Sequence, residues 1–393
     1  MAARRLADAL LLLLAASVPL STTGMEAAVL ALGGLTLLGA AGGWARVRAT
    51  PLDGVLGLFY GTLAASTLVS GHPLEATGWA RLWVVLTYFV VFWWLRDRRQ
   101  AIRFAHVLVG AGALAAAYGL LQHETGADWY RAALGRPLLV HPRETGGAGY
   151  AIVGFFRNYL TFAHTMLFPL AWATASAMGG ALAGLGAAAL LLVAIAFSTA
   201  RGVWLATVAV VATLVLMARG RTAGLAAGAL AAAALLAFAV SRDLRREAAH
   251  MFGLGGPNAG RVAIYAANLD IIHAHPVLGL GFGRYQRAAQ PFYAAHPEAD
   301  RHSHAHNDYL QIAAEAGLTG LAAFGLLFAT ALRCGWAAIA EAPDAATRAT
   351  AAGAWAGLVG FLVGGVTQYN FGDNEVAIAM WVALAVLMRL REP

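Results

Sequence analysis

Residues 181–218 read ALAGLGAAALLLVAIAFSTARGVWLATVAVVATLVLMA, and Arg201 is the only charged residue among them. A hydrocarbon core about 30 Å thick is crossed by roughly 20 apolar residues in an α-helix. The stretch is therefore long enough for two crossings, with Arg201 at the turn between them. Because lipid offers the backbone no hydrogen bonds, each crossing is expected to be helical.

The composition of the whole chain also indicates a membrane protein. Hydrophobic residues make up 60% of the 393 residues and charged residues only 12%, whereas soluble domains contain about 25% charged residues. These values exclude an ordinary soluble enzyme, and they exclude a disordered chain as well. Cys334 is the only cysteine, so a framework of internal disulfides is also excluded.

Apolar runs of membrane-spanning length occur about twelve times. They predict an all-α polytopic membrane protein with a single transmembrane domain over residues 1–393, and their many glycines and alanines suit close helix packing in lipid. We expect the first run to remain as a helix rather than to be cleaved as a signal peptide. The runs cover residues 6–22, 26–43, 52–70, 79–95, 101–122, 158–178, 181–199, 202–218, 222–240, 314–337, 349–369 and 374–391.

Arginines in the short connections predict the orientation of the chain. They fall on alternate connections, and cytoplasmic loops of membrane proteins carry an excess of basic residues. Both termini are therefore predicted to be cytoplasmic, whereas the arginine-free connections 21–26, 71–78 and 370–374 are predicted to lie outside. Two outer connections, 123–157 and 241–313, are long. Loops of this length are usually functional or disordered, and we expect these to be ordered because they contain helix-like and turn-like stretches.

The longer outer connection contains a helix-like segment at residues 261–274. We expect Pro276 to end this helix. The glycine-rich stretch 279–283 predicts a tight turn and not a dinucleotide-binding motif, because no βαβ unit surrounds it. The predicted apolar face of the helix consists of residues at helical spacing: Val262, Tyr265, Leu269 and Ile272.

The strongest local signal for chemistry is HSHAHNDYLQ at residues 302–311. Three alternate histidines suggest a zinc site, but alternate side chains of an extended chain lie about 6–7 Å apart, so one ion would require a bent backbone. A hydrogen-bonded structural histidine is a second alternative for His306. The third is a general base, because imidazole titrates near pH 6.5 and so offers a neutral form. We favour the base and expect no bound metal.

Arg201, Arg157 and Arg261 are candidates to bind an anion on the outer side. A charged side chain in the membrane costs free energy. For Arg201, this cost would be reduced either by a phosphate partner or by extension of the side chain toward the lipid headgroups. Arg261, at the start of the helix-like segment, is either a solvated charge or an anion ligand assisted by a helix N-terminus. Two guanidinium groups can offset the charge of a diphosphate without a metal. Further candidates for substrate contacts are Asn307, Trp204 and Arg143.

The residues from His306 onward resemble the His-Asn-x9-Gly-x-x-Gly motif of the O-antigen ligase family. His306-Asn307 is followed, after nine residues, by Gly317-Leu318-Thr319-Gly320. Residues 198–204 look like the family's Arg-Gly segment at an outer helix end. Residues 260–279 look like its approach to the active site in the large periplasmic loop. The resemblance covers most of the chain.

This resemblance implies the fold of a multispanning lipid-linked glycosyltransferase in the bacterial inner membrane, with 123–157 and 241–313 as periplasmic loops. It implies transfer of O-antigen from undecaprenyl pyrophosphate to a sugar hydroxyl of lipid A–core, with inversion and without metal, ATP or another cofactor. We then expect His306 to act as base and Arg201 and Arg261 to bind the diphosphate. The expected partners are this donor, this acceptor and membrane lipids, with no nucleic acid, and the chain is expected to be a monomer.

Other functions stay open. O-antigen polymerases and protein O-oligosaccharyltransferases belong to the same superfamily. The latter usually carry extra sequence after the spans, so we favour the ligase. A transporter or flippase of an anionic lipid-linked substrate would also have about twelve spans and outer arginines. Such proteins usually show related halves and broken helices near the midplane, and the two halves of this sequence show no similarity.

Overall fold

The computed structural model describes residues 2–45, 47–71, 77–140, 149–218, 220–250, 257–299 and 304–392. The chain is 78% helical, and no β-strand occurs in these ranges, which confirms the predicted all-α class. The helices are α1 (Ala2–Leu20), α2 (Thr22–Ala41), α3 (Asp53–Val69), the 3-10 helix η2 (Thr77–Val85), α4 (Leu86–Trp94), α5 (Arg98–Thr125), α6 (Trp129–Ala133), α7 (Tyr159–Met178), α8 (Leu182–Phe197), α9 (Arg201–Met217), α10 (Arg221–Val240), α11 (Arg242–His250), α12 (Pro257–Ala274), α13 (Tyr285–Ala288), α14 (Gln290–Tyr293), α15 (Asp308–Ala340), α16 (Ala345–Gly364) and α17 (Asn374–Arg391).

All twelve predicted apolar runs lie wholly or largely in helices. Within the described ranges, five helices are long and apolar enough to cross a membrane: α2, α5, α10, α15 and α16. Shorter apolar helical segments of 10–17 residues cover 53–69, 78–94, 182–197 and 201–217. The chain is therefore a helical protein of multi-pass character, and the count of twelve crossings stays a prediction.

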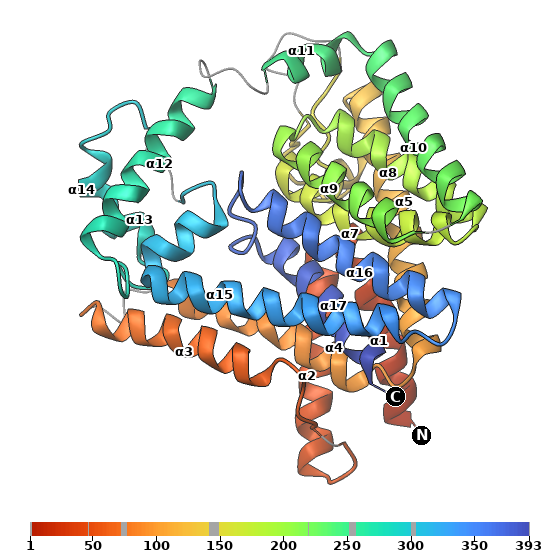
Figure 1. Cartoon of the computed structure of the whole chain (residues 1–393), viewed down its shortest axis with the longest axis horizontal. Helices are drawn as coiled ribbons and strands as arrows, with labels where there is room; N and C mark the ends of the chain where they lie inside the picture. Colours follow the sequence, from red (N-terminus) through yellow and green to blue (C-terminus); the bar gives the residue numbers. More distant parts are fainter. Residues whose placement is uncertain are drawn as a thin grey trace.

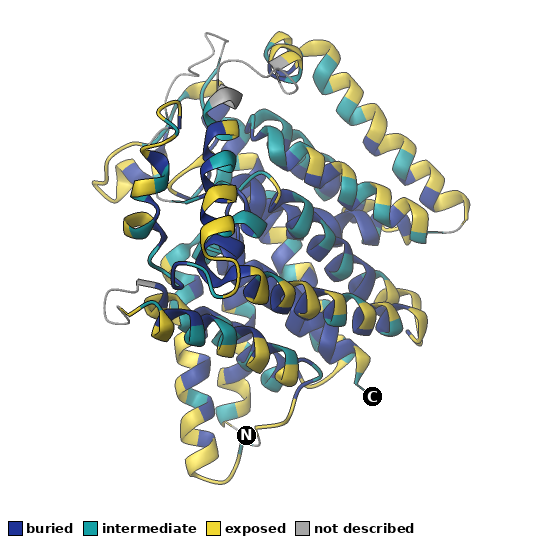
Figure 2. Ribbon diagram, turned by 60° about the vertical axis from the view of Figure 1, so that its left-hand side comes forward, coloured by how far each residue is buried: buried dark blue, intermediate teal, exposed yellow. Residues whose placement is uncertain are grey.

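Helices α7, α16 and α17 lie at the centre of the bundle (Figure 1). Helix α17 is buried from Val376 to Leu390, and α7 is buried from Thr161 to Ala175. Helix α16 packs against both α7 and α9. An apolar helix that is covered on all sides belongs to the core of a polytopic bundle. Helix α10, at the edge in Figure 2, is mostly exposed, as expected for a helix that faces lipid.

Helices α12, α13 and α14 form a small group beside the N-terminal half of α15, at the left of Figure 1. A second hydrophobic cluster, separate from the core of the bundle, holds this group together and includes Tyr285, Tyr293 and Ala314. The prediction of ordered helical structure in the connection 241–313 is therefore confirmed for its described residues. These helices therefore bring the connection 241–313 into contact with the first turns of α15.

The buried face of α12 is not the predicted one. Val262 and Leu269, which we expected to face a core, are 56% and 59% exposed. Small alanines allow helices to approach closely, so α12 turns an alanine-containing face toward its neighbours. The prediction counted large apolar residues and gave alanine too little weight, so it selected the wrong face of α12. The buried apolar residues are Ala263, Ile264, Ala267 and Ile271, and Asn268 is buried with them.

The glycine-rich stretch 279–283 is the predicted tight turn. Its three glycines have φ values of 65°, 100° and 77°, a region that suits glycine. The Leu280 backbone N–H donates to the Ala314 carbonyl, and the Gly281 N–H donates to the Glu315 carbonyl, each at 2.9 Å. The turn is therefore fixed to the first turns of α15.

Gly317 interrupts α15 at this contact. Its φ of 69° and ψ of −173° lie in a region that is essentially restricted to glycine. The Leu318 N–H turns outward and donates to the Pro276 carbonyl at 2.7 Å. A Cβ atom at position 317 would overlap the Val277 carbonyl group. The first glycine of the motif therefore joins α15 to the segment that follows α12.

We expect Gly317→Ala to destabilise the protein strongly. The strained φ/ψ alone costs about 1–3 kcal/mol in a non-glycine residue, and the clash with the Val277 carbonyl adds to it. Gly325→Ala on the same helix is the matched control, because a Cβ there meets no atom within 4 Å. Thermal unfolding in detergent should show a lower melting temperature for Gly317→Ala only, and equal melting temperatures would contradict the packing described.

Candidate active site

His306 lies in the last residues before α15 and has an unusual backbone. Its φ is 49°, which is uncommon for a residue other than glycine. The next residue, Asn307, is the N-cap of α15, and its Oδ1 accepts the Leu310 N–H at 2.9 Å. The Asn307 side-chain N–H donates to the Val366 carbonyl at 2.8 Å, and the Asp308 N–H donates to the Gly365 carbonyl at 2.7 Å. The end of α16 therefore fixes the position of His306.

The imidazole of His306 has polar neighbours on two sides. Its Nδ1 lies 2.9 Å from Oε1 of Gln368, and the ring of His304 is 4.2 Å away between centroids. The hydroxyl of Tyr265, on α12, lies between the carbonyls of His306 and Val366 at 3.2 and 3.1 Å. Burial raises the pKa of Tyr265, against the smaller opposing effects of Asn307 and Arg261. Tyr265 therefore acts as a neutral donor that ties α12 to the backbone of the histidine.

Arg201 is the first residue of α9, and the tip of this helix reaches the same connection between α16 and α17. Gly202 packs so closely on Thr367 that a Cβ would overlap the threonine side chain. Thr367 precedes Gln368, the partner of His306. The Arg201 guanidinium is only partly exposed and lies 4.0 Å from the Glu247 carboxylate on α11. An arginine that satisfies a carboxylate at this position has the geometry to bind another anion.

Arg261 lies one helical turn before Tyr265 on α12, so both side chains project from the same face. Its positive charge acts on the Tyr265 hydroxyl, which itself reaches the backbone of His306. The helix begins at Pro257 and not near Arg261, because proline is well suited to the first position of a helix. Arg261 therefore lies about one turn inside α12 and not at its first residue, and assistance to an anion from the N–H groups of the helix N-terminus stays a prediction.

The other predicted site residues are spread more widely. Arg157 is exposed immediately before α7. Trp204 packs edge to face on Phe238 of α10, with ring centroids 5.5 Å apart. Arg143 and His302 lie outside the described residues. No group of three potential metal ligands occurs in the described part of the chain, but the histidine triplet includes His302, so this does not test the zinc alternative.

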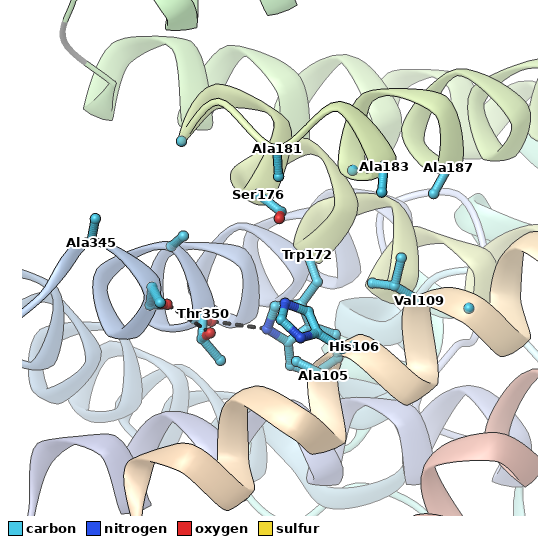
Figure 3. Close-up of a pocket in the computed structure, with 15 residues that line it drawn as sticks. Ala105, His106, Val109, Trp172, Ser176, Ala181, Ala183, Ala187, Ala345 and Thr350 are labelled. Atoms are coloured by element: carbon cyan, nitrogen blue, oxygen red, sulfur yellow. Dashed lines mark hydrogen bonds between the residues drawn. The ribbon is translucent and has the colours of Figure 1, made fainter.

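Two cavities were compared as possible sites. One of about 660 Å³ lies between α5, α7, α8 and α16, where Trp172 donates to the Thr350 carbonyl at 2.9 Å (Figure 3). Alanines and glycines line most of it, and His106 is its only titratable lining residue in the described chain. A second cavity of about 240 Å³ is lined by His304, Gln368 and many other polar side chains. The second cavity therefore adjoins the proposed base.

Sequence reasoning missed several residues at this second cavity. Gln368, Tyr369, Glu315 and Arg81 all line it. Arg81 interrupts an apolar run near its outer end, which is the same signal that identified Arg201. Nothing in the local sequence marks Gln368, because its contact with His306 joins residues 62 positions apart. The arrangement offers a base, two arginines and a polar cavity at one end of the bundle. It can deprotonate a hydroxyl and stabilise a phosphate leaving group.

Part of the chain is similar to one known protein family. Residues 186–325 match the family model described as O-antigen ligase. The matched range begins in α8 and ends in α15, so it includes Arg201, Arg261 and His306. A search of curated proteins found no match.

Proposed function

We propose that the protein is the ligase that completes lipopolysaccharide, because residues 186–325 match the family model described as O-antigen ligase. It transfers O-antigen from undecaprenyl pyrophosphate to a sugar hydroxyl of lipid A–core at the periplasmic face. The observation that carries the proposal is the convergence of α9, α12 and the α16–α17 connection on His306. These elements bring a base and two arginines to one end of the membrane bundle.

The contact between Gln368 and His306 supports the role of His306 as base. With Oε1 of Gln368 as the acceptor, Nδ1 carries the proton and Nε2 keeps its lone pair. Nε2 then removes the proton of the acceptor hydroxyl while the oxygen attacks the anomeric carbon. The bond from this carbon to the phosphate oxygen breaks, its electron pair leaves with undecaprenyl pyrophosphate, and the configuration inverts. Arg201 and Arg261 stabilise the charge that develops on the diphosphate.

The two ends of α15 support a membrane orientation. After the interruption at Gly317, residues 318–340 of α15 span roughly 35 Å at 1.5 Å per residue, enough to cross the hydrocarbon core. The active-site residues surround its first turn. Near its other end Cys334 contacts Arg391 at 3.1 Å, and Arg389 donates to the Leu95 carbonyl at 2.8 Å. Both termini lie on this side (Figure 1). We infer twelve crossings of the inner membrane, with cytoplasmic termini and a periplasmic site.

A reconstitution assay tests the proposal directly. Purified protein would be mixed with lipid-linked O-antigen and lipid A–core in EDTA, without ATP, and the products separated on a gel. A ladder of lipopolysaccharide supports the ligase. Lengthened lipid-linked chains would identify a polymerase instead, and movement of intact donor across vesicles without any new bond would identify a flippase. Activity that requires added zinc or magnesium would contradict the metal-free mechanism.

Replacement of Gln368 should slow turnover without weakening donor binding. Gln368→Leu removes the acceptor at Nδ1, so the ring loses its preferred tautomer. Loss of a partner that orients a metal-binding histidine typically lowers activity about 10–100-fold, and we expect turnover to fall by a similar factor here. Gln368→Glu is the matched control, because it keeps an acceptor. Its carboxylate should raise the pKa of the histidine and move the acidic limb of the rate profile to higher pH. Equal turnover of the leucine variant would exclude this role.

A further inference from the structure

The cavity of about 240 Å³ beside His306 has a built polar lining. Its walls come from η2, the residue before α7, the 279–283 turn, α13, the start of α15 and the α16–α17 connection. None of its lining residues in the described chain belongs to α9, α11 or α12, the helices that carry Arg201, Glu247 and Arg261. The cavity is therefore formed by a different set of elements from those that present the proposed diphosphate ligands.

The cavity is connected to the base through two side chains. Gln368 lines the cavity and also contacts Nδ1 of His306 at 2.9 Å. His304 lines it too, with its ring 4.2 Å from that of His306 and 5.9 Å from that of Tyr369. A molecule held in this cavity would therefore lie next to the catalytic imidazole.

The lining of the cavity does not suit a diphosphate. In the described chain Arg81 is its one arginine, and two acidic side chains, Glu315 and Asp373, line it as well. The Glu315 carboxyl group accepts the backbone N–H groups of Gly283 and Tyr285 at 3.0 and 3.4 Å. Asp373 accepts the Thr161 hydroxyl at 2.5 Å and caps α17. Hydrogen bonds hold both acidic side chains in place, and the described lining contains no second guanidinium group to offset a diphosphate.

The remaining lining suits an uncharged sugar. The amides of Asn158, Gln286 and Gln368 supply donors and acceptors for hydroxyl groups. The phenol of Tyr369 is neutral near pH 7, because tyrosine ordinarily ionises only near pH 10. The rings of Phe282 and Tyr369 offer apolar surfaces. The volume is below the about 300–1,000 Å³ of pockets for drug-sized molecules, which favours a single sugar ring.

We propose that this cavity binds the acceptor sugar whose hydroxyl attacks the donor. The proposal rests on the proposed transferase function. In an inverting displacement the nucleophile approaches opposite the leaving group, so the acceptor and the diphosphate occupy different sides of the reacting carbon. The α9 and α12 arginines serve the diphosphate side, and this cavity serves the acceptor side. Gln286, which lines the cavity and is exposed on the short helix α13, contacts a hydroxyl of the bound sugar.

Gln286→Ala tests the assignment, and Gln290→Ala is its matched control. Gln290 is the same residue type on the adjacent helix α14, and it does not line the cavity. Its side chain donates to the Gln286 backbone carbonyl at 2.9 Å, so this variant also tests whether a change at the Gln286 backbone alone affects the KM. Loss of one hydrogen bond to the sugar should raise the KM for lipid A–core roughly 3- to 10-fold, with the KM for the donor and kcat unchanged. Gln286→Trp should raise the acceptor KM further by filling the opening. The control should match the native enzyme.

Equilibrium binding separates this proposal from the function on which it rests. Core oligosaccharide freed of its lipid, and lipid-linked O-antigen, would each be titrated into native and variant protein. Weaker binding of the oligosaccharide alone by Gln286→Ala supports the acceptor site. Weaker binding of the lipid-linked donor, or no change with either ligand, overturns it. Native protein that binds core oligosaccharide but transfers no glycan to lipid A–core would contradict the ligase and leave the acceptor site supported.

Discussion

His306→Ala is expected to insert and fold normally but to transfer O-antigen about 10²–10⁴ times more slowly, because general-base help is typically worth that much. Donor binding should change little, since Arg201 and Arg261 remain in place. The rate of the native enzyme should fall as the pH is lowered, because a protonated imidazole has no lone pair for the hydroxyl proton. Transfer in reconstituted vesicles and titration of the donor measure the two effects separately.

Two variants control for the unusual backbone of His306. His306→Asn removes the base but suits the positive φ, because asparagine adopts this region more readily than most residues. It should be as inactive as His306→Ala and fold at least as well. His296→Ala removes another histidine of the connection 241–313. His296 pairs with Asp270 at 2.7 Å, and this variant should remain active. Native turnover in either variant of His306 would exclude the role of base.

Arg201→Ala and Arg261→Ala should each reduce transfer about 10²–10³-fold, the usual cost of losing one preorganised electrostatic group. Lysine at either position should restore activity only in part, because a point charge cannot reproduce the planar fork of guanidinium. Both alanine variants should also bind the lipid-linked donor more weakly. Titration of the donor distinguishes this defect from that of His306→Ala.

Glu247→Gln is the matched control for Arg201. It removes the carboxylate that lies 4.0 Å from the guanidinium but leaves the cation available for the diphosphate. Its transfer rate should stay near that of the native enzyme, because the pair is at the edge of ion-pair distance and the donor replaces it. Full activity in both arginine-to-alanine variants would show that the diphosphate binds elsewhere.

The helices were predictable because each apolar run must satisfy its own backbone in lipid. The cap at Asn307 was predictable too, since a side chain of this type before a helix stabilises its first turn. The face of α12 was not, because it depends on how closely Ala263 and Ala267 approach other helices. The partnership of His306 with Gln368 depends on tertiary packing between α15 and α16, and no local pattern records it.

The role of Arg81 marks an intermediate case. Like Arg201, Arg81 is an arginine near the predicted outer end of an apolar run. This pattern contains no information about which acidic side chains lie nearby in the fold. Only the fold shows that Glu315 and Asp373 share its cavity. Sequence therefore identifies arginines that are unusual in membrane segments, and the three-dimensional arrangement decides which of them face an anion.

Main-chain carbonyls at the end of α16 hold the active site together. The Gly365 carbonyl accepts from Asp308, and the Val366 carbonyl accepts from both Asn307 and Tyr265. The Val366 side chain itself is 49% exposed. The contacts at this position thus depend on the path of the chain and hardly on the identity of the side chain. A substitution of Val366 should therefore be tolerated, whereas a one-residue insertion or deletion beside it would separate His306 from its supports.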